Sequence, residues 1–110
     1  MSNNPRIEFL SALLKDNPND SFVLFALGKE YQNAGEPIQA LQFFEKLSTA
    51  DPNYTGLYFH LTKLYYELGQ IENAAKISSK GIQITREQGD QHAYSELNGL
   101  ILELGLDEEI

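Results

Sequence analysis

The chain has 110 residues, a formal net charge of −8 at pH 7 and no cysteine. Its length suits a single domain that buries roughly two-thirds of the surface exposed by the unfolded chain. The 42% hydrophobic and 22% charged residues are typical of globular proteins. The absence of cysteine excludes a disulfide framework, a thiolate metal site and a thiol nucleophile.

Acidic residues are concentrated at the C-terminal end. Residues 1–86 carry nine acidic and eight basic side chains, whereas residues 87–110 carry seven acidic and none basic. Proteins bind nucleic acids and anionic membranes through clustered lysines and arginines, and scattered basic residues provide no such cluster. We therefore expect neither a nucleic acid nor a membrane as a partner.

The N-terminal segment and the hydropathy pattern bear on location. Residues 1–14 do not resemble a secretory signal, because they lack a basic start and because Arg6 and Glu8 interrupt their apolar run. No apolar stretch approaches the roughly 20 residues that span a bilayer. We expect a cytoplasmic protein.

The first predicted helix covers residues 5–15. Asn4 followed by Pro5 is typical of a helix start, since Asn caps free N–H groups and Pro suits the first helical position. Residues 16–19, which include Pro18, end it. Its apolar side chains recur at helical spacing, at Ile7, Leu10, Leu13 and Leu14.

A helical hairpin is predicted over residues 20–49. Asp20 or Asn19 caps its first helix, which ends near residue 33, and Gly35 suits the left-handed conformation that follows many helices. Pro37 opens its second helix. The apolar positions of the pair are Phe22, Leu24, Ala26, Leu27, Tyr31, Ile38, Ala40, Leu41, Phe44 and Leu47.

A second hairpin is predicted over residues 54–86, with a turn at Gly69, followed by a last helix over residues 90–104 that Asp90 caps and Gly105 ends. Residues 106–110 form an acidic tail. We expect this tail to be too short and too charged to add a structural layer.

The two hairpins share a pattern with a period of 34 residues. Leu24-x2-Leu27-Gly28-x2-Tyr31 is followed by Ala40-x3-Phe44 and Pro52, and Tyr58-x2-Leu61-Thr62-x2-Tyr65 repeats the first part. The pattern resembles the tetratricopeptide repeat. The resemblance implies an all-α fold, a right-handed α-solenoid segment of about six antiparallel helices. It comprises two full hairpins and a flanking helix at each end, in one domain over residues 1–110, with the end helices as caps.

The second repeat departs from the family pattern. Thr62 replaces a small glycine or alanine, Ser78 replaces the aromatic residue that Phe44 supplies, and Gly81 replaces an alanine. A glycine inside a helix costs about 1 kcal/mol relative to alanine. We therefore expect Gly81 to mark a close approach by a neighbouring helix.

The resemblance also implies a concave groove lined by the first helix of each repeat. Phe25 and Phe59 are 34 residues apart, as are Lys29 and Lys63, so the groove would present two aromatic side chains with two ammonium groups. The groove residues carried over from the family are Phe22, Phe25, Lys29, Gln32, Phe59, His60, Lys63 and Tyr66.

Two interpretations of these aromatic residues stay open. Aromatic residues at helical spacing commonly belong to the core, but Phe25 and Phe59 lie one residue away from the buried stripe of their helices. If they are exposed, the groove suits an extended or helical peptide with an acidic group and an apolar anchor. The leading hypothesis is thus a noncatalytic protein-protein interaction module, a scaffold with no cofactor.

One subfamily is disfavoured. Modules that clamp the C-terminal carboxylates of chaperones use lysine, asparagine and arginine at set groove positions. This sequence has Phe25, Lys29, His60, His92 and Glu96 there, so only one cation fits the pattern.

The alternative hypothesis is a self-associating structural or assembly subunit that forms homo-oligomers through its end helices. The tail, residues 107–110, could enter the groove beside Lys29 and Lys63 of a neighbouring molecule. A solvated tail that serves solubility is the favoured interpretation of the same residues.

An enzyme is the least favoured class. The two histidines, His60 and His92, lack metal-site spacing, and the sequence has no glycine-rich phosphate loop and no Gly-x-Ser-x-Gly motif. The paired carboxylates Glu108 and Glu109 lie in the tail, where nothing raises a pKa for acid catalysis. No catalytic, metal or cofactor site is therefore predicted.

Overall fold

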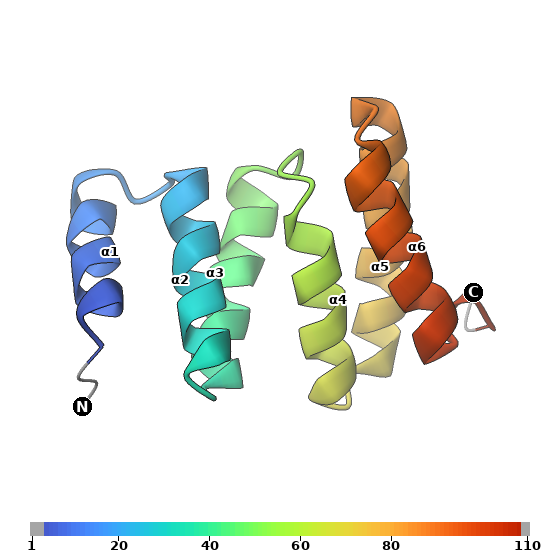
Figure 1. The fold of residues 1–110 in the computed structure, drawn as a ribbon, viewed down its shortest axis with the longest axis horizontal. Helices are drawn as coiled ribbons and strands as arrows, with labels where there is room; N and C mark the ends of the chain where they lie inside the picture. Colours follow the sequence, from blue (N-terminus) through green and yellow to red (C-terminus); the bar gives the residue numbers. More distant parts are fainter. Residues whose placement is uncertain (1–3, 109–110) are drawn as a thin grey trace. The chain divides into compact units, whose positions relative to one another are not determined.

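The structure, a computed structural model, describes residues 4–108. Over these residues it is all-α, as the sequence predicted, and the chain divides into two compact units, Met1–Asp51 and Pro52–Ile110. The prediction of one domain over the whole chain stays a prediction. The elements are α1 (Pro5–Asp16), α2 (Ser21–Asn33), α3 (Pro37–Ala50), α4 (Leu57–Glu67), α5 (Ile71–Gln88), α6 (Gln91–Leu104) and the 3-10 helix η1 (Leu106–Glu108) (Figure 1).

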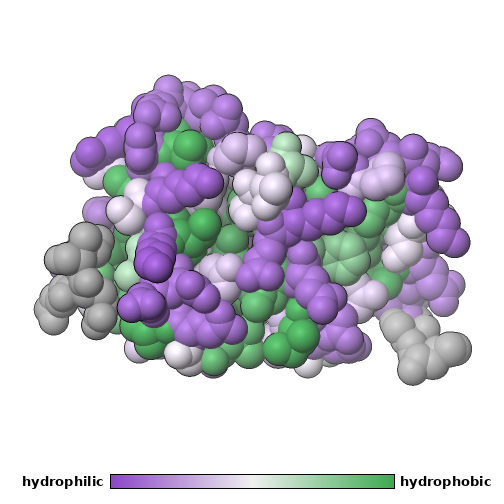
Figure 2. Space-filling model, turned by 180° about the vertical axis from the view of Figure 1, so that it is seen from behind, coloured by the Kyte–Doolittle hydropathy of each residue, from purple (hydrophilic) through white to green (hydrophobic). Residues whose placement is uncertain are grey.

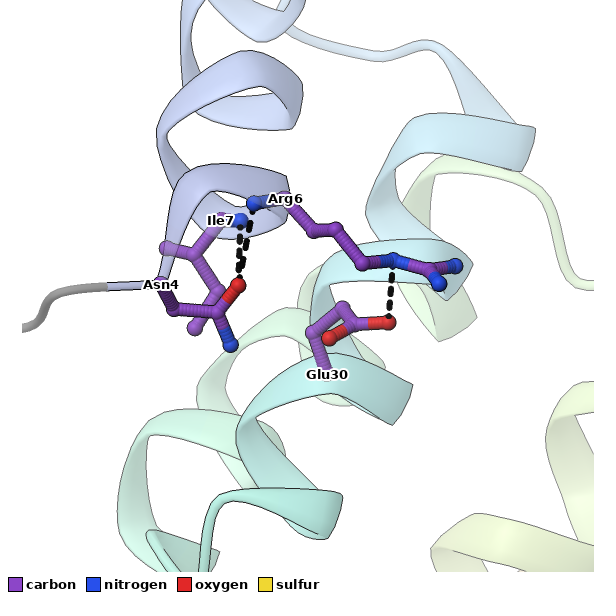
Figure 3. Close-up of polar contacts among 4 residues, drawn as sticks. All are labelled: Asn4, Arg6, Ile7 and Glu30. Atoms are coloured by element: carbon purple, nitrogen blue, oxygen red, sulfur yellow. Dashed lines mark hydrogen bonds and ion pairs between the residues drawn. The ribbon is translucent and has the colours of Figure 1, made fainter.

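The ends of the helices follow from the predicted caps. The Asn4 side chain accepts hydrogen bonds from two backbone N–H groups of α1, at 3.0 and 3.2 Å (Figure 3). Asp20, rather than Asn19, caps α2 by accepting from the Val23 N–H at 3.1 Å. Gly35, just after α2, has a φ of 75°, a left-handed conformation that glycine adopts without strain.

The first unit consists of a hairpin, α2 and α3, with α1 packed on α2. Ile7 and Leu10 of α1 join Val23 and Leu27 of α2 in one apolar cluster. The two helices of the hairpin are in close contact, because a Cβ atom added at Gly28 would overlap the Phe44 ring. The first unit is thus built around the meeting of Gly28 and Phe44.

The second unit contains the hairpin of α4 and α5, with α6 packed on both. Tyr58, Leu61 and Leu97 are fully or almost fully buried in it. Each first helix of a hairpin therefore carries buried residues that the 34-residue pattern predicted, although Tyr31 of α2 is only half-buried. Each second helix lies behind the first in the view of Figure 1.

The expectation that the tail adds nothing structural is wrong for its first residue. Leu106 lies in η1 and is 1% exposed, and η1 packs on α5 and α6. Asp107 is exposed. The helical end at Gly105, with a φ of 71°, turns the chain so that an apolar side chain returns to the core. Residues 109 and 110 of the predicted tail lie outside the described residues.

Two other residues predicted on buried stripes are exposed. Leu13 of α1 is 40% exposed and Ile38 of α3 is 55% exposed. Both have the helical spacing of a core residue, but the packing that buries Leu10 and Ala40 leaves Leu13 and Ile38 accessible. Helical periodicity predicts which face of a helix is apolar, but it does not determine how many residues of that face are buried.

The predicted close approach at Gly81 is confirmed. Gly81 is buried in α5, and a Cβ atom there would lie 2.6 Å from Leu97 Cδ2 of α6 and 2.6 Å from Tyr58 Cβ of α4. Contacts between carbon atoms at such distances are repulsive, and Tyr58 Cβ cannot move without its backbone. Gly81 is therefore a point at which α5 packs closely against both α4 and α6.

Thr62 and Ser78 lie 34 residues after Gly28 and Phe44, and both are fully buried. A larger residue in the first helix is thus matched by a smaller one in the second, which keeps the combined volume of the pair within what a close-packed interior allows. The Ser78 hydroxyl donates to the Ala75 carbonyl at 3.0 Å. The Thr62 hydroxyl has no hydrogen-bond partner among the described residues.

We predict that Gly81→Ala lowers the free energy of unfolding by about 1–3 kcal/mol, because the added methyl group overpacks the meeting point of three helices. Gly99→Ala is the matched control, since Gly99 is also inside a helix of this unit but has nothing within 4 Å of the position that a Cβ atom would take. Gly99→Ala should instead stabilise the protein by up to about 1 kcal/mol through helix propensity. Urea unfolding followed by circular dichroism measures both, and equal effects would contradict the packing argument.

We also predict that Thr62→Val raises the free energy of unfolding by about 1 kcal/mol, because it removes an unpaired buried hydroxyl at nearly constant volume. Thr85→Val is the control within the same unit. Thr85 is also buried, but its hydroxyl donates to the Gly81 carbonyl at 2.9 Å, so its replacement should bring no such gain. A loss of stability in Thr62→Val would indicate that the hydroxyl is satisfied in solution.

Candidate binding surface

The start of each first helix is fixed by a hydroxyl-carboxylate hydrogen bond. Ser21, the first residue of α2, donates its hydroxyl proton to Asp51 at the end of α3, with 2.6 Å between the oxygens. Thr55, two residues before α4, donates to Asp90 at 2.5 Å. Ser21 and Thr55 are 34 residues apart, so the same device positions the first helix of both hairpins.

Asp90 serves two helices at once. It accepts the Thr55 hydroxyl and, through its other oxygen, the Ala93 N–H at 3.0 Å, which caps α6. The hydroxyl hydrogen bond, followed by the backbone one, lowers the pKa of Asp90 from its ordinary value of 3.8. The carboxylate is thus held ionised, which suits a structural anchor and opposes a role as a proton donor.

In the first unit, Phe25 and Lys29 are neighbours on α2. The Lys29 ammonium nitrogen lies 5.8 Å from the centre of the Phe25 ring, within the range of a cation-π interaction. The Phe25 ring lies 5.9 Å from the Phe44 ring and is half-buried, as are Lys29 and Gln32. Phe25 therefore lies at the edge of the core. One part of its ring packs on the core residue Phe44, as the first interpretation expected, and another part stays accessible, as the second expected.

Phe22 lies elsewhere on α2. Its side chain is 66% exposed and borders a pocket of about 410 Å³ between α1 and α2. The residues that line this pocket are Pro5, Arg6, Phe9, Leu10, Phe22 and Ala26. Phe22 thus contributes to an apolar pocket beside α1.

In the second unit, Phe59 and His60 of α4 are half-buried, with their ring centres 5.4 Å apart and their planes nearly perpendicular. Lys63 and Tyr66 are exposed, Tyr66 at 36%. These four positions therefore bring two aromatic rings, an imidazole and an ammonium group to the accessible side of one helix.

Phe9 was not among the residues predicted from the sequence. It is 64% exposed and lines the same pocket as Phe22. The available signal was its spacing, since Phe9 and Leu13 are four residues apart and lie next to each other on a helix surface. The apolar stripe of α1 was assigned to Ile7, Leu10, Leu13 and Leu14, and Phe9 lies beside it.

The described residues were also compared with the requirements of a metal site and of a membrane-spanning helix. Over residues 4–108, no group of three or more His, Cys, Asp or Glu side chains is placed to hold a metal ion. None of the helices in that range combines the length and the apolar character needed to cross a membrane. His92 pairs with Glu96 at 3.5 Å on one exposed face of α6.

The second helices present a different surface. Figure 2 is seen from behind and shows many hydrophilic side chains with hydrophobic ones between them. Lys46 of α3 and Lys80 of α5 are exposed lysines of these second helices. They provide a reference for the lysines of the first helices, because they carry the same charge on a different face of each hairpin.

Comparison with known proteins agrees with the repeat pattern and the fold. A family model described as tetratricopeptide repeat matches residues 31–97, more than half of the chain. The chain belongs to the tetratricopeptide repeat family. A tetratricopeptide repeat of this kind is a protein-interaction module, and this class applies to the chain.

Relatives and solved structures extend the comparison. A tetratricopeptide repeat domain protein from Salinibacter ruber is 37% identical, covers 78% of this chain and 96% of its own, and superposes with a TM-score of 0.75. A TPR repeat-containing protein of Pseudomonas aeruginosa is 26% identical over 89% of this chain and 93% of its own length. PcrH, in complex with the chaperone binding region of PopD, shares the fold at 18% identity, with a TM-score of 0.82 over 93% of this chain and 77% of its own.

The lowered pKa of Asp90 predicts a pH dependence with a definite sign. A carboxyl group whose pKa falls on folding stabilises the native state above the pKa of the unfolded chain, near 3.8, and loses that contribution as the pH drops through the folded value. We expect Thr55→Val to raise the pKa of Asp90 towards 3.8 and to reduce the acid sensitivity of the second unit. Carboxyl-carbon NMR titration measures the pKa directly. Ser21→Val, which leaves Asp90 untouched, is the control, and an unchanged Asp90 pKa in Thr55→Val would contradict the assignment.

Proposed function

We propose that this tetratricopeptide repeat protein is a noncatalytic scaffold that binds a peptide with an acidic group and an apolar anchor on the first helix of a hairpin. The first unit offers such a contact on α2, and the second unit offers a separate one on α4. The observation that carries the proposal is the pair of Phe25 and Lys29, in which an ammonium group lies beside an accessible aromatic edge. An acidic side chain is attracted by the ammonium group, while an apolar one removes ring surface from water.

The second unit offers the same types of group within one helix. Lys63 follows Phe59 by four residues, as Lys29 follows Phe25, so the two side chains lie on one face of α4. Tyr66 adds an exposed ring with a hydroxyl group, a side-chain type enriched where proteins bind partners. Each unit therefore has its own aromatic and cationic contact.

The fold relatives support a peptide as the ligand class. PcrH, which shares the fold, is known in complex with a region of another protein, PopD. By analogy of fold alone, we propose a protein segment rather than a small molecule as the partner of this chain. A cytoplasmic location, which the sequence pattern suggested, belongs to the same proposal.

The test uses a phage-displayed library of random twelve-residue peptides selected on the immobilised full chain. Enriched peptides should combine Asp or Glu with Leu, Phe or another large apolar residue. A synthetic peptide of the enriched sequence should bind Lys29→Ala about fivefold more weakly than the parent chain, which corresponds to about 1 kcal/mol.

Lys46→Ala provides the matched control, because Lys46 is an exposed lysine of the same unit on the second helix α3. Its affinity for the same peptide should be unchanged. Enrichment of peptides without acidic residues, or equal losses in Lys29→Ala and Lys46→Ala by calorimetry, would reject the proposed surface.

A further inference from the structure

One side of α1, beside the pocket that it forms with α2, carries exposed apolar side chains in its middle. Phe9 is 64% exposed and Leu13 is 40% exposed, and they are four residues apart on one face of the helix. Phe22 of α2 is 66% exposed and lines the same pocket as Phe9. We call Phe9, Leu13 and Phe22 the α1 patch. Three large apolar side chains at such exposure form a surface that water disfavours.

Charged residues of opposite sign stand at the two ends of this face. Arg6, near the start of α1, has a side chain that is 79% exposed, and its Nε lies 3.0 Å from a Glu30 oxygen (Figure 3). A guanidinium group has five N–H donors, so this ion pair leaves others to face outward. Asp16, at the last position of α1, is exposed.

When two copies of α1 run antiparallel, the positive end of one helix lies beside the negative end of the other. If two copies of α1 pack antiparallel about Ser11, residues whose numbers add to 22 lie at the same level. Phe9 then lies opposite Leu13 of the second copy, and Arg6 lies opposite Asp16 of the second copy. A parallel arrangement would instead place Arg6 beside Arg6. Ala12, small and exposed near the centre, lets the two helices approach closely.

The exposed apolar area of the α1 patch is small, which suits a weak and reversible dimer. An aromatic side chain buries roughly 150–250 Å², so the exposed parts of Phe9 and Phe22 offer roughly 250 Å² per copy. Two copies bring roughly half of the 1,000 Å² that a specific interface requires. Leu13, Ala12 and the charged ends supply further area, and the pocket of about 410 Å³ beside Phe9 can accept a large side chain.

We propose that a second copy of this chain docks on the α1 patch, with the two α1 helices antiparallel about Ser11. The interface is isologous, so each copy gives and receives the same contacts. It uses α1 and the start of α2, and it does not depend on the peptide contact at Phe25 and Lys29.

Sedimentation velocity of the full chain over a range of concentrations tests the dimer. Phe9→Asp should weaken dimerisation at least about tenfold, because it places a charge at the centre of the interface. Ile38→Asp is the matched control, since Ile38 is 55% exposed in the same unit but lies on α3, and it should leave the dimer unchanged. Circular dichroism checks that both variants fold.

Cross-linking tests the antiparallel register. Because the chain has no cysteine, Ala12→Cys introduces a single thiol next to the proposed twofold axis, and mild oxidation should convert most of the protein to a disulfide-linked dimer. Ser79→Cys, an exposed site on α5, should remain mostly monomeric under the same conditions. A disulfide needs its two Cα atoms within about 7 Å, so efficient linkage reports the arrangement itself.

Several results would overturn the proposal. They are a chain that sediments as a monomer up to about 1 mM, a dimer that survives Phe9→Asp but not Ile38→Asp, and equal cross-linking through the two thiols. The result of the peptide-binding test with Lys29→Ala is independent of the dimer test, because that variant leaves the α1 patch intact.

Discussion

The close approach of paired helices is the constraint on which the rest of the structure depends. In the first hairpin it requires Gly28, because the Phe44 ring occupies the space of any larger side chain. In the second unit Gly81 has the same role against two helices. The second hairpin replaces the pair of glycine and phenylalanine with Thr62 and Ser78, which are both buried. Close packing of the two helices is thus achieved with different side-chain volumes in the two hairpins.

This packing determines where functional side chains can lie. The residues that define the repeat, such as Leu24, Leu27 and Phe44, are fully buried and therefore unavailable to a partner. Positions between them, such as Phe25 and Lys29, remain partly accessible on the same helix. Family membership is carried by the first set, and our proposal assigns the contact with a partner to the second set, whose positions can vary without disturbing the core.

Much of the fold could be predicted from the sequence. Helix starts at Asn4, Asp20 and Asp90 rest on local hydrogen bonds, and the turns at Gly35 and Gly105 rest on a local backbone conformation. Such features depend on a few neighbouring residues, which the sequence displays directly. The 34-residue period then indicates which helices pair.

The misplaced residues have a common cause. Leu13 and Ile38 have the spacing of core residues, yet they are exposed, and Leu106 was assigned to a solvated tail, yet it is buried. Their burial depends on whether another element lies opposite, which is a property of the tertiary structure. The candidate site shows the same limit, since the 34-residue spacing indicated Phe25 and Phe59 but gave no sign that Phe9 and Phe22 share a pocket.

The double role of Asp90 has a consequence for how the second unit opens. The Asp90 carboxylate ties Thr55, two residues before α4, to the start of α6, and α5 lies between them in the chain. Fraying of α6 at its first turn therefore also releases the entry to α4. Two helices, α4 and α6, thus share one polar anchor, so the local opening of one is coupled to the opening of the other.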